Sequence, residues 1–501
     1  MGGKLTPLNQ NDFSGGANLV TNPYDLKKNQ LLRVRNMILA EHGSLQTRPG
    51  VTLDTTSPTT NPVLYNGNLY ASTNFPFSIQ TVGGVNHLFR TDVIPWTDIG
   101  AFQTAYATPQ SSTVLGKEFF IAGYETPWTW DGTTFAQIGA GGGETVPPGA
   151  KHGAFHLSTM WLWNTNATTT TLDGPSSLRA SAVNNIASWP SNFQAFIGKD
   201  DGQQGMGLAQ YTIAESGISP TTTLIAFKEY SGYQISGTFG GTIAIQKIKS
   251  DLGCIAPRTI QFVTGFGIVR MTHKGFALYN GVDDKLISEE VRPAIYGNGI
   301  DFTSLDFNNI SRSWAAQQPN PPFYIAACPV SGSPLTRFFI YDLVRQAWTI
   351  CDFPIQFQSI NTVFTPMSVV VKAGGADGQG NVYTIFGLTD TSDLGSPVHW
   401  SFTPSPAYMG SPTAMSYWRR LLLDMTYAPG QVVNFSTAVQ GTVALTTNSR
   451  TLPLTITEGR TDIDLGVKTT ALTTTVSGTG NVKVRGLTWQ GRTMPLTNSV
   501  R

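Results

Sequence analysis

Charged residues are scarce in this 501-residue sequence: they make up 13% of it, against about 25% in an average globular protein. This scarcity argues against long charged helices. The 32 Lys and Arg residues nearly balance the 31 Asp and Glu residues, so the net charge does not suggest tight binding to a nucleic-acid duplex. Hydrophobic residues make up 40%, which is enough to support a folded core and argues against disorder.

Cysteines and long apolar runs are also few. Cys254, Cys328 and Cys351 lie far apart, so they form neither a disulfide framework nor a Cys-x-x-Cys metal motif. No stretch reaches about 18 consecutive apolar residues, and the first residues lack the apolar core of a signal peptide. We therefore expect synthesis and folding in a reducing cytoplasm.

Short β-type runs, separated by Gly, Pro, Asn or Asp, dominate from about residue 60 to about residue 400. This texture is typical of an all-β sandwich, barrel or propeller. Similar units of consecutive strands occur at 119–138, 267–287 and 337–354, and spacings of roughly 40 to 70 residues are those of propeller blades with loops of varying length. The sequence thus predicts an all-β fold with a β-propeller of about six to eight blades over 60–400.

Aromatic residues in these units are expected to fill the spaces between blades, principally Trp128, Phe276, Tyr279 and Trp348. A four-stranded blade cannot bury both of its faces alone, so blades must pack against one another. A pair of β-sandwiches would show the same turn frequency and stays open as the alternative fold.

The two flanks, residues 1–59 and 401–501, have a different texture. Apolar residues near helical spacing predict a short N-terminal helix over Tyr24–Leu39, and 41–51 predicts a hairpin that ends at Arg48-Pro49-Gly50. The Thr-rich alternation after residue 401 predicts a small C-terminal β domain. A short amphipathic helix needs a surface to pack on, so we expect the flanks to carry assembly contacts. The candidate residues are Lys27, Arg33, Arg35, Arg48, Arg419 and Arg420.

Catalytic groups do not form a convincing pattern. His152 and His156 are placed on one strand face, but no third metal ligand accompanies them. Glycoside hydrolysis needs two carboxylates held across a sugar. The sequence pairs none of its candidates, which are Glu118, Glu144, Glu215, Glu229, Glu289 and Glu290. Glu289 and Glu290 are instead expected at the start of a short helix. The sequence therefore predicts no enzyme activity, no metal and no cofactor.

Three segments resemble one family of bacteriophage virion proteins, in the same order. The first has Phe-x-Gly-Gly at 13–16, Asn-Pro at 22–23, Asn36, and Gly-x-Leu-x-x-Arg-Pro-Gly at 43–50. The second and third are the strand-rich segments 224–237 and 265–295. These segments are similar to the tail nozzle, or packaged-DNA stabilisation, proteins of short-tailed phages.

The resemblance implies a β-propeller subunit of a hexameric ring on the tail axis of the virion. Its partners would be the adaptor ring beneath the portal and a distal fibre, spike or needle protein. The ring would retain packaged double-stranded DNA and conduct it during ejection, without sequence-specific binding and without a small-molecule substrate. A weakly charged lumen suits this role, because a basic wall would hold the polyanion.

Two other functions compete with this one. A propeller that binds or hydrolyses carbohydrate during receptor recognition would use the abundant aromatic residues, although it lacks a carboxylate pair in the sequence. A cytoplasmic propeller scaffold is disfavoured, because the sequence shows no WD-type repeats with their Gly-His and Trp-Asp signatures.

Overall fold

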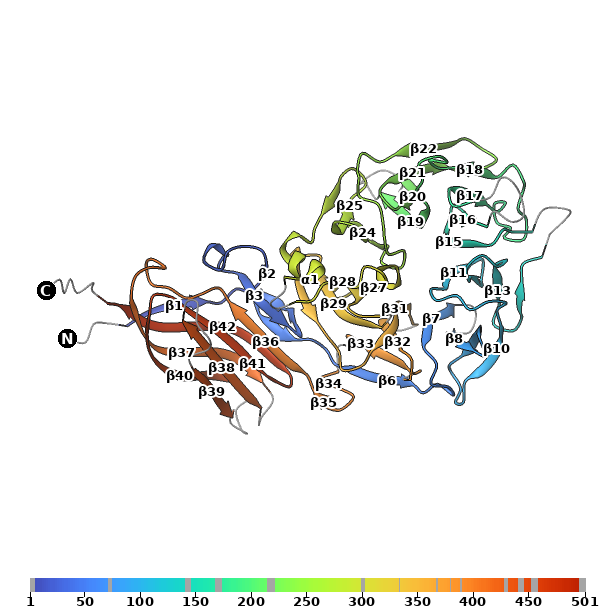
Figure 1. Cartoon of the computed structure of the whole chain (residues 1–501). Coiled ribbons are helices and arrows are strands. Elements are labelled where there is room, and N and C mark those ends of the chain that lie inside the picture. Colours follow the sequence, from blue (N-terminus) through green and yellow to red (C-terminus); the bar gives the residue numbers. More distant parts are fainter. Residues whose placement is uncertain are drawn as a thin grey trace.

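Seven four-stranded antiparallel sheets form a ring in the computed structural model (Figure 1). The structure describes residues 5–494 apart from 71–73, 140–145, 167–173, 214–220, 299–301, 333, 366–367, 379, 388–389, 428–430, 440–445 and 452–457. The first strand of each sheet faces the ring axis, where it contacts the first strand of a neighbouring sheet. This arrangement is a β-propeller, so the predicted all-β class and the range of six to eight blades are confirmed.

Six blades follow one another along the chain, each running from the axis to the rim. The first three are β7 (Val63–Tyr70), β8 (Asn74–Val82), β9 (Val85–Arg90) and β10 (Thr97–Ala101); β11 (Gln110–Val114), β12 (Lys117–Ile121), β13 (Trp128–Trp130) and β14 (Phe135–Gln137); and β15 (Ala150–His156), β16 (Thr159–Thr165), β17 (Ser177–Ala180) and β18 (Gln194–Phe196). The next three are β19 (Gly205–Ile213), β20 (Thr221–Lys228), β21 (Gly232–Gly237) and β22 (Ile243–Lys247); β23 (Gln261–Val263), β24 (Gly267–Thr272), β25 (Gly275–Tyr279) and β26 (Asp284–Leu286); and β27 (Trp314–Pro319), β28 (Pro322–Pro329), β29 (Leu335–Asp342) and β30 (Ala347–Cys351).

The seventh blade joins the two ends of the propeller sequence. It consists of β31 (Phe357–Phe364), β32 (Val369–Gly375), β33 (Val382–Ile385) and, at the rim, β6 (Val51–Thr55). β6 comes from the segment predicted to lie outside the propeller, so the boundary placed at residue 59 is wrong. The reason is physical: a ring of sheets needs backbone hydrogen bonds to hold its first and last blades together, and a strand from before the first blade provides them.

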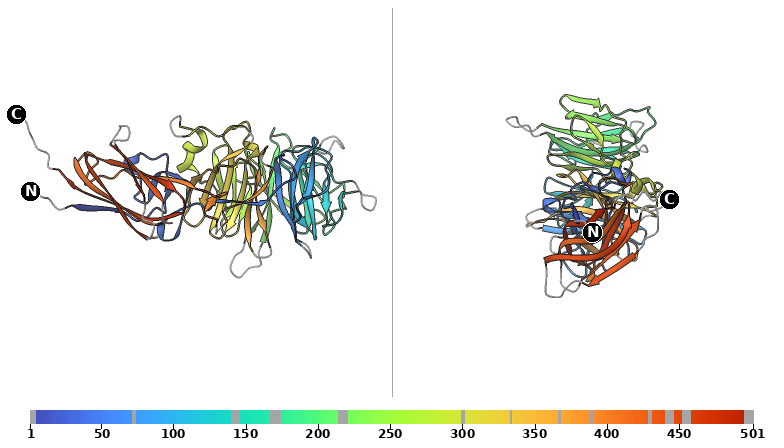
Figure 2. Two further views of the ribbon diagram at one scale, coloured as in Figure 1. Left: turned by 90° about the horizontal axis from the view of Figure 1, so that it is seen from below. Right: turned by 90° about the vertical axis from the view of Figure 1, so that its left-hand side faces the viewer.

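Apart from β34 (Ser392–Asp393) and β35 (Ser396–Pro397), which extend the seventh blade beyond β6, the remaining strands form a β-sandwich at the rim of the propeller, to which both ends of the chain contribute (Figure 2). One sheet contains β4 (Met37–Leu39), β5 (Leu45–Thr47), β42 (Val482–Thr493), β37 (Ser416–Tyr427), β40 (Glu458–Thr469) and β1 (Thr6–Gln10). The other contains β2 (Gly16–Ala17), β3 (Gln30–Arg35), β36 (His399–Pro404), β41 (Leu472–Thr479), β38 (Val432–Val439) and β39 (Thr446–Thr451). The C-terminal β domain therefore includes strands from the predicted N-terminal segment.

The predicted helix over Tyr24–Leu39 is wrong. Only Pro23–Asp25 is helical, as a single 3-10 turn, and β3 and β4 follow it. A β-bulge in β3 between Leu31 and Arg33 shifts the register against β36 by one residue. The bulge places Leu31 and Val34, three residues apart, among the buried side chains. An extra residue in a strand thus imitates the i, i+3 spacing of a helix.

A short α-helix does occur where Glu289 and Glu290 were expected to begin one. A 3-10 turn at Glu289–Val291 leads into α1 (Arg292–Tyr296), whose Ala294 and Ile295 are buried. None of the described helices is long and apolar enough to cross a membrane.

The predicted aromatic packing between blades is observed. Phe276 of the fifth blade and Trp348 of the sixth are both fully buried, with ring centroids 5.1 Å apart. Tyr279 packs toward the fourth blade against Tyr211, at 5.8 Å. Trp128 lies 5.8 Å from Phe102, which follows the first blade. These four rings therefore join neighbouring sheets.

Candidate assembly surface at the domain junction

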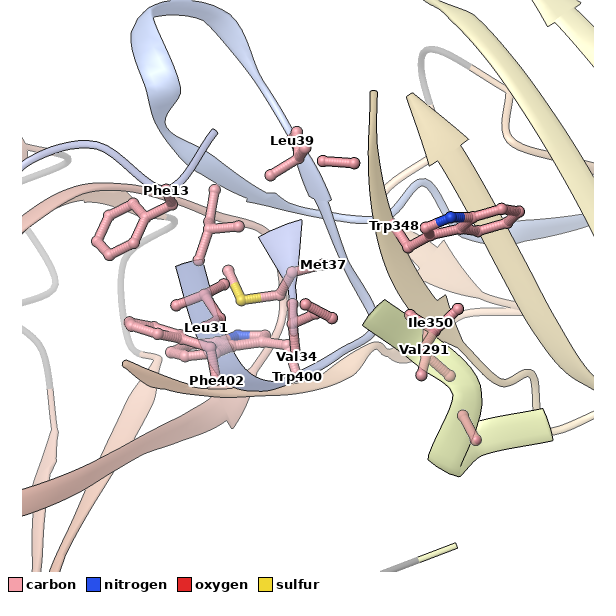
Figure 3. Close-up of a cluster of buried hydrophobic side chains, with 14 of the residues drawn as sticks. Phe13, Leu31, Val34, Met37, Leu39, Val291, Trp348, Ile350, Trp400 and Phe402 are labelled. Atoms are coloured by element: carbon pink, nitrogen blue, oxygen red, sulfur yellow. The ribbon is translucent and has the colours of Figure 1, made fainter. Parts of the chain in front are cut away.

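The sandwich meets the propeller at the outer strand of the sixth blade. Arg35 of β3 pairs with Ile350 of β30 in a parallel bridge. Behind this bridge, side chains from both units form one continuous core, shown in Figure 3. The core includes Leu31, Met37 and Phe402 from the sandwich and Trp348 from the propeller. Burial of this shared apolar surface holds the two units together.

The Phe-x-Gly-Gly segment lies in this junction. Phe13 is fully buried and packs edge-on against Phe402, with ring centroids 5.8 Å apart. Gly16 has a φ of 60°, and a Cβ atom there would lie 2.6 Å from the Trp348 carbonyl oxygen. Only glycine combines this backbone conformation with so close an approach to another strand. The segment is therefore a packing element between the units.

Asn36 links three segments of the junction. It has a φ of 56°, in the left-handed region that Asn tolerates better than most residues. Its side-chain Nδ2 donates to the His399 carbonyl at 2.8 Å, and its Oδ1 accepts from the Asp352 backbone N–H at 2.9 Å and from Arg48 Nε at 3.3 Å. Asn36 thus sits at a turn between β3 and β4 and not in a helix.

Arg48 is buried with an exposed fraction of 2%. Its Nη1 and Nη2 donate to the two carboxylate oxygens of Asp393 at 2.9 and 2.7 Å, and Nη2 also donates to the Asp352 carbonyl at 2.8 Å. The guanidinium lies 3.9 Å from the ring centroid of Phe353. Because these partners enclose the side chain, Arg48 cannot be the assembly contact that the sequence predicted. It is an internal clamp between the sandwich and the propeller.

Gly50 completes the Arg48-Pro49-Gly50 motif. A Cβ atom on Gly50 would lie 1.9 Å from the Ser392 carbonyl oxygen. Ser392 belongs to β34 (Ser392–Asp393), which pairs with β35 (Ser396–Pro397) and with β6. The motif therefore connects the sandwich to β6, the closing strand of the propeller. It lies next to the hairpin that carries Asp393.

Arg33 and Arg35 are exposed on one face of β3, where the structure is hollowed. Arg35 forms a two-point ion pair with Asp352 across the junction, and its side chain is 68% exposed. A hollow of about 470 Å³ contains both arginines and Arg337 of the propeller. A second hollow, of about 690 Å³, lies on the other side of the Arg35–Asp352 pair. The two hollows form a grooved surface with basic side chains, which we call the junction surface.

Lys27 lies close to Glu290 of the propeller and outside the two hollows. Its charge lowers the pKa of Glu290, although burial raises that pKa more strongly. Glu290 Oε1 accepts from Gln30 Nε2 at 3.1 Å, and its backbone carbonyl accepts from the Leu19 N–H at 2.8 Å. The ammonium group of Lys27 itself stays exposed. The junction therefore includes three of the predicted basic residues, Lys27, Arg33 and Arg35, each next to the propeller.

Arg419 and Arg420 lie elsewhere, on β37 of the sandwich. A bulge between Trp418 and Arg420 interrupts the pairing of β37 with both of its neighbours. Arg419 is the extra residue and is exposed, whereas Arg420 Nε donates to Asp464 at 3.1 Å. The structure therefore divides the six predicted residues into three at the junction, two on the sandwich and one buried clamp.

The carboxylates considered for catalysis are dispersed over the described chain. Glu118 belongs to the second blade, Glu229 follows β20 of the fourth, and Glu290 contacts the sandwich. Glu144 and Glu215 lie outside the described residues. A search of the described part of the chain finds no group of three His, Cys, Asp or Glu side chains able to hold a metal ion.

Glu118 has a strongly perturbed pKa. Burial raises this pKa from 4.5 to about 7, although hydrogen bonds from Ser111 and Thr113 act in the opposite direction. The folded protein therefore binds more protons here than the unfolded chain between pH 4.5 and 7, so the free energy of unfolding falls as the pH rises through this window. The total loss from this group is roughly 3 kcal/mol.

We expect Glu118→Gln to remove this dependence. Denaturant unfolding at several pH values should show that the wild-type protein loses stability relative to the variant from about pH 4.5 to about pH 7. Glu125, whose pKa burial also raises to about 7, is present in both proteins and cancels in the comparison. A constant difference between the two proteins over this range would show that Glu118 ionises normally.

Comparisons with known proteins show no family. No family model matches the sequence, and no curated protein matches it significantly. Similar solved structures include the WD40 domain of Neurospora crassa Pan2, with 9% identity and a TM-score of 0.37 over 68% of this chain and 95% of that domain. They also include BBS1N in complex with ARL6DN, with 7% identity and a TM-score of 0.40 over 70% of this chain and 98% of that one. PorZ of Porphyromonas gingivalis has 10% identity and a TM-score of 0.36 over 74% of this chain and 44% of its own. The strand pairing described above shows an all-β propeller with a flanking β-sandwich.

Proposed function

We propose that this protein is a structural subunit of a ring on the tail axis of a short-tailed phage. In this role it retains packaged DNA and conducts it during ejection, as the resemblance to tail nozzle proteins implies. Six copies surround the lumen, between an adaptor ring and a distal fibre, spike or needle protein. The chain acts by assembly and not by catalysis.

One observation carries the proposal: the residues of the resembling N-terminal motif converge on the domain junction. Phe13 and Gly16 pack between the units, and Asn36 and Arg48 hydrogen bond across the junction. A motif whose residues fix the angle between the sandwich and the propeller suits a subunit whose copies must fit together in a closed ring. It does not supply groups for a reaction.

The propeller axis is unsuited to be the DNA conduit. All seven innermost strands contribute side chains to a cavity of about 170 Å³ there, with Tyr65 and Trp314 among them. This volume is far too small for a duplex. The lumen must therefore lie between subunits, and the propeller serves as a wall of the ring.

The junction surface is the proposed contact with a neighbouring subunit or tail protein. We expect Arg33→Glu, which reverses a charge in the first hollow, to prevent incorporation into tails without reducing the stability of the purified protein by more than about 1 kcal/mol, since the residue is exposed. Particles grown with the variant as the sole copy would be analysed by gel and mass spectrometry. The matched control is Lys247→Glu on the outer strand of the fourth blade, which is equally exposed there.

Lys247→Glu should enter tails normally. Normal incorporation of Arg33→Glu, or equal exclusion of both variants, would contradict the assignment of the junction surface.

A further inference from the structure

Arg258 occupies an unusual position on the propeller axis. It lies in the connection between the fourth and fifth blades, where its backbone carbonyl accepts from the Ala315 N–H at 2.9 Å. Its side chain lines the axial cavity and the residue is 8% exposed. A guanidinium stays charged in proteins, so the structure places a buried positive charge beside the axial cavity.

The partners of this guanidinium are neutral. Nη1 donates to the Gln110 side-chain oxygen at 2.9 Å, and Nη2 donates to the Thr108 carbonyl. The ring of Trp314 lies 5.8 Å away. The Nε–H is buried and has no hydrogen-bond partner among the described residues. An unpaired buried donor of this kind costs free energy unless something binds to it.

Two other buried cations of the propeller are each paired with an aspartate. Arg270 pairs with Asp284, and Lys228 Nζ lies 2.6 Å from Asp201 Oδ1. Arg258, by contrast, has no Asp or Glu within ion-pair distance in the part of the chain that the structure describes. Burying a charge without a counter-charge costs several kcal/mol, so this contrast indicates a missing anion.

The cavity beside Arg258 is suited to hold one. Its volume of about 170 Å³ accommodates several water molecules or one small anion. His152, which is 5% exposed, also lines it, and its Nδ1 has no described partner. Burial and the nearby Arg258 lower the pKa of His152, so the imidazole is neutral and its free nitrogen is available as an acceptor for a protonated oxyanion.

We propose that the axial cavity binds a small oxyanion between Arg258 and His152. The Arg258 Nε–H donates to one oxygen of the anion, and the charge of the guanidinium balances that of the ligand. An oxygen that carries a proton donates to His152 Nδ1. The ligand is a small inorganic oxyanion that keeps a proton near neutral pH, such as phosphate, because an ionised carboxylate has no O–H to donate to His152 Nδ1. This inference does not depend on the proposed tail function.

The test is isothermal titration of the full-length protein with inorganic phosphate and, separately, with acetate at constant ionic strength. We expect saturable binding of one phosphate per chain and an at least tenfold loss of affinity in Arg258→Met. His152→Gln should weaken binding as well, and it provides the test if Arg258→Met does not fold. Arg35→Ala, which removes an exposed arginine, is the matched control and should bind as the wild type does.

Each outcome has a clear meaning. Binding of phosphate without binding of acetate supports the proposed site, whereas equal binding of acetate would contradict the hydrogen bond from the anion to His152 Nδ1. Absence of saturable binding by either anion would overturn the proposal and leave a cavity filled by water. Unchanged affinity in both Arg258→Met and His152→Gln would also overturn it, because the anion would then bind elsewhere.

Discussion

Replacing Arg48 with methionine is expected to lower the free energy of unfolding by about 3–5 kcal/mol. The loss arises because Asp393 would keep its buried charge without a partner, and because the Asp352 carbonyl would lose a donor. Both side chains of the pair are at least nine-tenths buried. Denaturant unfolding followed by tryptophan fluorescence measures the effect.

Two variants define the origin of this loss. Arg35→Ala removes the exposed ion pair with Asp352 at the same junction, and should cost no more than about 1 kcal/mol. Arg48→Met combined with Asp393→Leu removes both buried charges and should recover most of the stability. If Arg48→Met and Arg35→Ala had equal effects, Arg48 would not be the clamp that we describe.

Replacing Trp348 with alanine is expected to cost about 3–5 kcal/mol. The indole is fully buried between the fifth and sixth blades, against Phe276 and against Tyr341 at 4.6 Å. Its Nε1 also donates to the Ile287 carbonyl at 2.7 Å. The substitution would leave a cavity and an unpaired carbonyl at the blade next to the junction. Thermal and denaturant unfolding would report the loss.

Tyr230→Ala is the control for this prediction, because that aromatic side chain is half exposed on a propeller loop. It should change stability by no more than about 0.5 kcal/mol. The opposite pattern, with Trp348→Ala stable but unable to bind a glycan, would favour carbohydrate recognition over a structural role for the ring.

The propeller could be predicted because its blades are local in sequence. Each blade before the seventh is built from four consecutive strands joined by tight turns, so the turn residues and the aromatic strands recur along the chain. Closure by β6 could not be predicted in this way. Its partner β33 lies more than 300 residues away, and the sequence of Val51–Thr55 does not indicate which strand it pairs with.

The predicted N-terminal helix shows a limit of periodicity. Leu31 and Val34 are buried in a strand because a bulge displaces the register between them. Spacing alone cannot distinguish a bulged strand from an amphipathic helix over so short a stretch. The exposed Arg33 and Arg35 alternate with the buried Val34 as in a strand, but this pattern covers only three residues.

Residue type identified part of the assembly surface. Lys27, Arg33 and Arg35 are exposed at the junction, whereas Arg48 is buried. The burial of Arg48 could not be predicted, because its partner Asp393 lies 345 residues further along the chain. The axial site was not predicted at all. Arg258 becomes unusual only when seven innermost strands are brought together around it and no acid accompanies it.

Counting the copies of this chain in assembled tails tests the central claim most directly. Native mass spectrometry or an averaged electron-microscopy image of purified tails would give the number and show where the lumen lies. We expect six copies around a lumen formed between propellers. Three or twelve copies, or DNA density along a propeller axis, would contradict the proposed ring.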